Sequence, residues 1–446
     1  ISFASVNVEE PLKALSAVLA IDLYTPRAVS ALEISSLLQT ALEGHELSLR
    51  VAGVHDTSSS WDDVTRYAIV DDGRGAALAQ LYERTVDAFL GGADGVLEAL
   101  ALDLIAEFQQ LYLQRTPEIM ICTTPIFFCH VLRKALPEHQ GSLIIYVSEL
   151  LDIVPAWMEG EIVADVVRAV SSSERSAHII ASSPFTAALV EYVAGVQVPV
   201  VPRVALYAPQ LEHRGRKSRN VMIQRCDGWI NSMHGLMFLR LLFKFLATNK
   251  WMNLRFLSTM QQLSDEAFAA TDPTGSLVGP RGVFVNLADN QEIRTFDEIW
   301  AATMDVCFAT VIFPNELGER TFYEAYSLGL PILTPGRKYL ARLLVSMQYY
   351  HLVPRHQLHT VLPNVTGRFL FAPFIIPEAE DLLQAYYWAG FLDFVNFDCI
   401  TRFESVPELL SALLTSDVAE ISNCMVWTRH QQIVRAKQVW HAALSR

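Results

Sequence analysis

The 446-residue chain is 51% hydrophobic and 18% charged. That length predicts two domains of roughly 200 residues each, with large apolar cores. The net charge of −14 argues against a general nucleic-acid-binding protein, which is usually basic, and favours a soluble chain.

No charge-free apolar run reaches the length of about eighteen residues that a membrane-spanning helix needs. The most hydrophobic helix, Gly235 to Ala247, contains Arg240 and Lys244 and is interpreted as a core helix. We therefore expect no transmembrane segment, and a cytoplasmic location is slightly favoured over the secretory lumen.

Short apolar runs alternate with helical patterns through the first half of the chain. An N-terminal strand and a helical cap both stay open for the first forty residues. A helix is predicted at Gly95–Gln114, where apolar residues recur with a period of ~3.6. This alternation implies a doubly wound parallel sheet. Strands are predicted at Leu49–Val54, Ile119–Thr123, Leu143–Val147 and His178–Ala181.

A second α/β half follows a proline-rich stretch, Val198–Pro202, and a polar, basic stretch, His213–Arg219, which is the best linker candidate. Two Rossmann-like domains in tandem create a cleft between the carboxyl ends of their strands, where ligands of open sheets bind. Strands are predicted at Val221–Gln224, Leu254–Leu257, Gly282–Leu287, Val306–Pro314 and Pro331–Thr334, and helices at His234–Thr248, Asp297–Met304 and Asn423–Ser445.

The most informative segment runs from Phe313 to Pro335 and contains two glutamates, Glu316 and Glu324, eight positions apart. Its order is buried strand, polar turn, helix, glycine stop and buried strand. Gly318 lies in the turn, where backbone N–H groups at the helix start can face an anion. Glu324 lies about one and a half turns into the helix. This pattern suits a nucleotide-sugar, with phosphates at the helix start and hydroxyls on the carboxylates.

The segment resembles the donor-binding E-x7-E motif of GT-B glycosyltransferases, especially the retaining type, whose motif ends in a Gly-x-Pro-(Val/Ile) strand. Here that exit is Gly329-Leu-Pro-Ile. The family usually has Glu-Pro-Phe-Gly at the front, and this chain has Glu316-Leu-Gly318, which is one residue tighter. The resemblance covers residues from about Ile119 to the end and is weak before that.

Retaining GT-B enzymes typically have Gly-Arg after the first strand of the second domain, and Lys-Gly opening the next helix. Arg225 matches the arginine, whereas His234, followed by Gly235, takes the place of the lysine. A histidine is only partly charged at neutral pH, so this departure weakens the stabilisation expected for the leaving group. Arg320 is a candidate for the missing positive charge, or else a surface arginine paired with a glutamate of the motif.

The resemblance implies a GT-B architecture with an N-terminal acceptor domain at 1–205, a C-terminal donor domain at 206–420, and a helix at 421–446 returning to the first. It also implies transfer of a sugar from a nucleotide-diphosphate sugar, such as a UDP-sugar, to an unknown acceptor, with no cofactor, no metal and no nucleic-acid partner. Glu316 and Arg320 are the catalytic candidates. The donor-binding candidates are Arg225, His234, Gly235, Gly318, Thr321 and Glu324.

Two alternatives remain open at this point. A GT-B-shaped protein that has lost catalysis would serve as a scaffold or subunit, which the His234 replacement and the shortened turn favour. A nucleotide-sugar epimerase would need acid–base groups in the cleft, and His130 and Glu149 are candidates. The six cysteines form no CxxC motif, so free core thiols are expected and structural zinc is not.

Overall fold

The computed structural model shows a chain that divides into two compact units. Unit 1 comprises residues 1–207, 354–372 and 432–446, and unit 2 comprises 208–353 and 373–431. The structure describes residues 18–24, 28–43, 46–52, 68–70, parts of 77–88, 94–112, 117–123, 126–136, 142–147, 177–224, 233–258, 284–286, 296–314, 320–346, 366–371 and 382–444.

Unit 1 is built on a parallel sheet with the strand order β3-β2-β1-β4-β5-β6. The first strand, β1, lies in the middle of the sheet; β2 and β3 continue to one edge, and β4, β5 and β6 follow on the other side of β1. This is the order of a Rossmann fold. The strands are β1 (Val18–Tyr24), β2 (Glu46–Ala52), β3 (Ile69–Val70), β4 (Ile119–Thr123), β5 (Ser142–Val147) and β6 (Ala177–Ala181).

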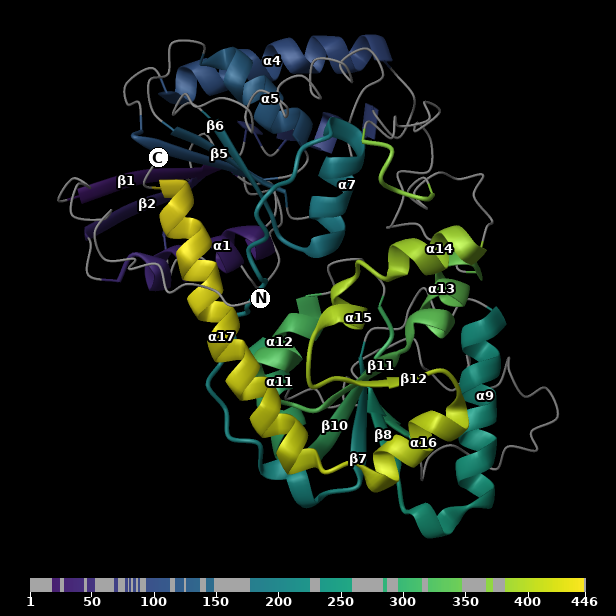
Figure 1. The fold of residues 1–446 in the computed structure, drawn as a ribbon. Coiled ribbons are helices and arrows are strands. Elements are labelled where there is room, and N and C mark those ends of the chain that lie inside the picture. Colours follow the sequence, from purple (N-terminus) through teal and green to yellow (C-terminus); the bar gives the residue numbers. More distant parts are fainter. Residues whose placement is uncertain are drawn as a thin grey trace. The chain divides into compact units, whose positions relative to one another are not determined.

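Helices cover both faces of this sheet (Figure 1). One apolar layer joins the sheet to α4 (Asp94–Tyr112), α5 (Ile126–Ala135) and α7 (Pro184–Ala194). The other joins it to α1 (Ala28–Ala41) and to the end of α17 (Val418–Leu444), where the buried Trp440 ring stacks on Tyr146. Because both faces are covered, the inner strands β4 and β5 are almost entirely apolar, as the sequence indicated.

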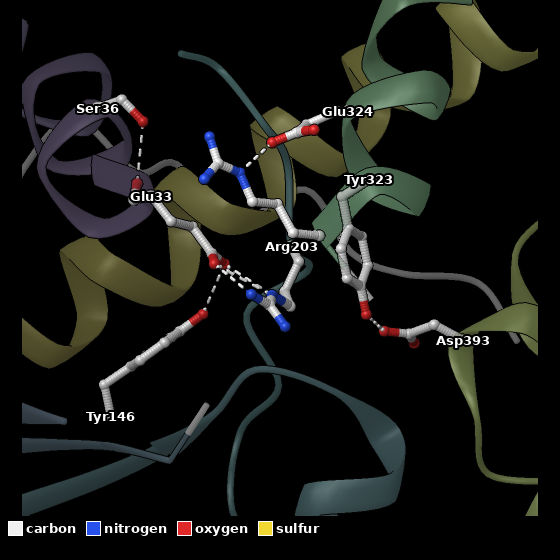
Figure 2. A network of polar contacts seen from close by, with 8 residues as sticks. Glu33, Ser36, Tyr146, Arg203, Tyr323, Glu324 and Asp393 are labelled. Atoms are coloured by element: carbon white, nitrogen blue, oxygen red, sulfur yellow. Dashed lines mark hydrogen bonds and ion pairs between the residues drawn. The ribbon is translucent and has the colours of Figure 1, made fainter. Parts of the chain in front are cut away.

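A buried ion pair ties three parts of unit 1 together (Figure 2). Glu33 in α1 and Arg203, in the segment after β6, are 3% and 5% exposed. The Arg203 Nε and Nη2 atoms donate to the Glu33 carboxylate at 2.7–3.1 Å, and the Tyr146 hydroxyl of β5 donates to it at 3.0 Å. The charge-assisted, forked geometry satisfies groups that would be costly to bury alone.

Unit 2 repeats the same topology, with the parallel order β12-β11-β10-β7-β8-β9. Its first strand, β7, again lies beside its fourth, β10. The strands are β7 (Asn220–Gln224), β8 (Arg255–Ser258), β9 (Phe284–Asn286), β10 (Cys307–Ile312), β11 (Ile332–Pro335) and β12 (Thr401–Phe403).

Helices also flank the second sheet (Figure 1). Buried apolar side chains join one face to α9 (Met233–Thr248), α13 (Arg337–Ser346) and α16 (Val406–Thr415). The other helices within the described residues of unit 2 are η3 (Arg214–Lys217), η4 (Lys250–Met252), α11 (Phe296–Val306), α12 (Arg320–Leu328), α14 (Leu382–Ala389), α15 (Asp393–Asn396) and the first part of α17. The α/β class predicted from the sequence, with two Rossmann-like units, is confirmed by both sheets.

Most predicted strands match within two or three residues, and β4 matches in full. For the first forty residues the sequence left open an N-terminal strand and a helical cap. The structure has the strand, β1, and it lies in the middle of its sheet. The strands β3 and β12 were not predicted. They have two and three residues, too few to show an apolar period.

The expectation of free core thiols is wrong for four cysteines. Cys122 at the end of β4 bonds Cys129 in α5, and Cys399 bonds Cys424 in α17. The backbone brings the two Cα atoms of each pair to 5.6 and 5.8 Å, a proximity that the sequence does not display.

The basic stretch His213–Arg219, expected to be a linker, packs into unit 2. His213 is buried, and its Nε2 lies 2.8 Å from the Cys307 carbonyl oxygen of β10. The 3-10 helix η3 starts at the next residue, and a Cβ on Gly215 would lie 2.2 Å from the same oxygen. The division between the units falls earlier, between Tyr207 and Ala208.

Candidate functional site

The topology of unit 2 identifies one edge of its sheet as the candidate ligand site. Strand order reverses between β7 and β10, so the connections after these two strands diverge to opposite sides of the sheet. Open α/β sheets bind ligands at the carboxyl ends of the strands, at such a switch point. Helix α9 follows β7 and helix α12 follows β10. The predicted donor-binding residues all belong to these two connections.

The structure describes only part of this predicted set. Arg225 directly follows the last residue of β7, and it lies outside the described residues, as do Glu316 and Gly318. His234 and Gly235 are the second and third residues of α9, so their backbone is at that helix start, and their side chains are not described. Arg320 and Thr321 begin α12.

Glu324 is the buried carboxylate of the site, with 2% of its surface exposed. Its Oε1 accepts a hydrogen bond from Arg320 Nε one helical turn earlier, and its Oε2 accepts one from the Trp300 indole at 3.3 Å. Figure 2 labels Glu324, and a dashed line marks a contact of its carboxylate. Both carboxylate oxygens therefore accept hydrogen bonds from described side chains, one from α12 itself and one from α11.

The sequence left two roles open for Arg320, either supplying positive charge to the site or pairing with a glutamate of the motif. Its ion pair with Glu324 is the alternative that the sequence left open, and its side chain is 18% exposed. Trp300 in α11 was missed because nothing in its local pattern distinguishes it from a core tryptophan, and only the packing of α11 beside α12 brings it to Glu324.

A hydrogen bond to α15 and a glycine at its C-terminal end are two further features of helix α12. The Tyr323 hydroxyl donates to the buried Asp393 carboxylate at the start of α15, and the two side chains point toward one another in Figure 2. The helix ends at Gly329, whose φ of +69° is the left-handed conformation that favours glycine. The predicted glycine stop is thus confirmed.

The neighbouring helix starts in unit 2 are already occupied by the chain's own groups. At α13 the Glu404 carboxylate accepts from the backbone N–H of Lys338 at 3.2 Å and of Tyr339 at 2.6 Å. At α16 the Ser405 hydroxyl accepts from the Glu408 N–H. Helices α9 and α12 have no acidic residue in their first turns. Their positive ends therefore suit an anion better than that of α13 does.

Within the part of the chain that the structure describes, no group of three or more histidine, cysteine, aspartate or glutamate side chains could hold a metal ion. Of the described helices, none by itself has the length and apolar composition to cross a bilayer; α16 and α17, bent by 93° at their junction, pass that test only when taken together. The epimerase candidate His130 is buried in α5, and Glu149 lies outside the described residues.

No protein-family model and no curated protein matches this chain. Similar solved structures include CalG4, the calicheamicin glycosyltransferase, at 11% identity and a TM-score of 0.42 over 96% of this chain and 99% of that one. A UDP-glucosyltransferase from Polygonum tinctorium is 10% identical, with a TM-score of 0.46 over 96% of this chain and 99% of that one. UDP-GlcNAc 2-epimerase from Methanocaldococcus jannaschii is 9% identical, with a TM-score of 0.43 over 71% of this chain and 83% of that one.

Because these TM-scores are all below 0.5, the fold assignment comes from the sheets themselves. Both have the Rossmann strand order, and the last fifteen residues belong to the first unit. The chain has a GT-B-like fold. Within this GT-B-like fold, the β7/β10 edge of unit 2 is where the two connections that carry the predicted donor residues begin.

Proposed function

We propose that this protein binds a nucleotide-diphosphate sugar at the β7/β10 edge of unit 2 and transfers the sugar to an acceptor. In this proposal Arg225, Arg320 and His234 neutralise the diphosphate as the bond to the sugar breaks, together with the backbone at Gly235, Gly318 and Thr321. Glu316 holds the sugar hydroxyls. A clamp of this kind supplies positive charge and preorganised donors without a metal.

The buried carboxylate of Glu324 is the observation that carries the proposal. Burying a charged carboxylate is unfavourable in free energy because it loses its hydration, whereas a glutamate on the solvated surface keeps it. Here the carboxylate lies on the helix after β10, at the switch point, and is oriented by Arg320 and Trp300. A carboxylate at this place suits the paired hydroxyls of a ribose, which is the role that the motif implies.

The pairing of Arg320 with Glu324 favours a second candidate, a GT-B-like scaffold without catalysis. An arginine that already neutralises a carboxylate supplies less charge to a phosphate. If His234 also contributes only a partial charge, nucleotide binding survives and transfer is slow or absent. The two candidates therefore share the binding site and differ in turnover.

Thermal-shift screening of the whole protein against nucleoside diphosphates and their sugars tests the binding step. We expect at least one diphosphate to raise the Tm. Calorimetry then follows Glu324→Gln, which keeps the shape and removes the charge. The expected loss of affinity is about tenfold or more, since a hydrogen bond to a charged group contributes about 1.5–3 kcal/mol. Arg225→Ala should weaken binding of the diphosphate by a similar factor.

Glu33→Gln is the matched control, because Glu33 is an equally buried, arginine-paired carboxylate in unit 1. It should lower the Tm and leave the nucleotide Kd unchanged. A wild-type protein whose Tm responds to no diphosphate, or a Glu324→Gln variant with the wild-type Kd, contradicts the proposal. Release of the free nucleotide only when an acceptor is added indicates transfer; interconversion of the sugar without an acceptor indicates an epimerase.

A further inference from the structure

Helix α9 exposes an apolar stripe that the sheet of unit 2 does not cover. Met237, Leu241 and Phe245 recur every fourth residue and are 56%, 56% and 43% exposed. Trp251, in the short η4 helix that follows, is 73% exposed. We call these four residues the α9 stripe. Exposed residues of this size normally occur singly, so a row of four on two consecutive helices indicates a surface that contacts something.

The opposite side of α9 is the one that packs into the core. Phe238, Leu242 and Leu246 are 6%, 1% and 4% exposed and contact the apolar layer that also includes α13 and α16. In Figure 1 the helix lies at the outer side of unit 2. The interpretation of this segment as a core helix is therefore correct for one face only. The α9 stripe lies on the outward face and contributes little to the core.

The stretch of sequence that carries the stripe has charged residues of one sign only. Residues 228–264 contain no aspartate or glutamate and contain Arg240, Lys244, Lys250 and Arg255, although the whole chain has a net charge of −14. Lys244 is exposed on the same face of α9 as the stripe. A cationic, acid-free segment within an acidic protein selects an anionic partner.

The chemistry of that partner follows from the combination of features. A helix that presents methionine, leucine, phenylalanine and tryptophan beside lysine or arginine lies in the interface plane of a bilayer, with its apolar side chains at the acyl boundary. At 16 residues, α9 is about 24 Å long, so it can lie along such a surface. A second copy fits less well, because a two-fold contact between stripes would bring Lys244 against its own counterpart.

We propose that the α9 stripe docks unit 2 on an anionic lipid surface. Met237, Leu241, Phe245 and Trp251 enter the headgroup region, and Lys244 contacts lipid phosphates. This inference is independent of the proposed sugar transfer, because it uses the outward face of α9 and not the helix start.

Cosedimentation of the whole protein with vesicles tests the proposal. Neutral phosphatidylcholine vesicles are compared with vesicles in which about a third of the lipid is phosphatidylglycerol, an anionic fraction that attracts cationic segments. We expect binding to the anionic vesicles only. Trp251→Ser should weaken the partition about tenfold through lost apolar burial. Lys244→Glu should weaken it about fivefold or more, since a lysine near such a surface contributes about 1 kcal/mol.

Matched controls lie elsewhere on unit 2. Trp427 in α17 is 65% exposed, and Trp427→Ser should bind like the wild type, as should Lys217→Glu on the exposed η3 helix. All four substitutions are at exposed positions, so far-UV circular dichroism should show an unchanged fold. Equal binding to both vesicle types, binding to neither, or equal losses in the Trp251 and Trp427 variants would overturn the proposal. A concentration-dependent dimer that Trp251→Ser abolishes would assign the stripe to a second copy instead.

Discussion

The buried ion pair of unit 1 allows a stability prediction that does not depend on function. Glu33→Gln keeps the size of the side chain and an acceptor oxygen for Tyr146, and removes the negative charge. Arg203 then remains 5% exposed and charged, and it has lost the Glu33 carboxylate. Breaking a buried pair in this way costs about 3–5 kcal/mol, because a charge stays in a low-dielectric interior without the carboxylate that it faced.

The same reasoning predicts how a second substitution behaves. Arg203→Met alone leaves the Glu33 carboxylate buried with only the Tyr146 hydroxyl as a partner, so it is also costly. In the Glu33→Gln background it removes the buried positive charge that has lost the Glu33 carboxylate. We therefore expect Arg203→Met to cost about 2 kcal/mol less in that background than in the wild type, which is a coupling energy typical of contacting residues.

Native-state hydrogen exchange is the appropriate measurement, because a protein of two units need not unfold in one step. Peptides from α1 and β5 should lose protection in Glu33→Gln, and those from unit 2 should not. Glu98→Gln, at an exposed position on α4, should stay within about 0.5 kcal/mol of the wild type. A cost of Glu33→Gln below about 1 kcal/mol, or additive single-variant costs, would refute the reasoning.

Three further predictions concern unit 2 and the cysteines. The thiol of Cys307 should not react in the native protein at about pH 8, because burial raises its pKa to about 12 and so keeps it protonated there. A Cys226→Ser variant unfolded without reductant should expose one reactive thiol, and reduction should release four more; five before reduction would contradict the two disulfides. Tyr323→Phe should destabilise unit 2 by about 1.5–3 kcal/mol in urea unfolding, since it removes the hydroxyl bonded to the buried carboxylate that begins α15. Gly215→Ala should lower the Tm because its Cβ would meet the backbone of β10 at 2.2 Å, whereas Gly95→Ala, with no neighbour within 4 Å, should not.

Much of the fold was predictable because buried parallel strands are apolar throughout and are separated by helices. β4 and most of the strands in both units were identified from such runs, and the helix after β10 from its turn and glycine stop. The candidate site could be predicted as two connections at one edge of the second sheet. How its side chains pair could not, and Arg320 illustrates the difference, because its partner depends on which rotamers the packing around α12 allows.

The sequence by itself determined the α/β class, the order of the main strands and the segments from which a donor site would come, because these depend on local periodicity and on turn residues. Tertiary structure alone decided the partners of four cysteines, the indole bonded to Glu324, the Glu33–Arg203 pair and the face of α9 that reaches solvent. The paired groups are between 7 and 170 positions apart in the sequence and meet only when helices pack on a sheet. The exposed face of α9 is the side that this packing leaves uncovered. A local sequence pattern does not indicate which distant side chain will lie beside it in the folded protein.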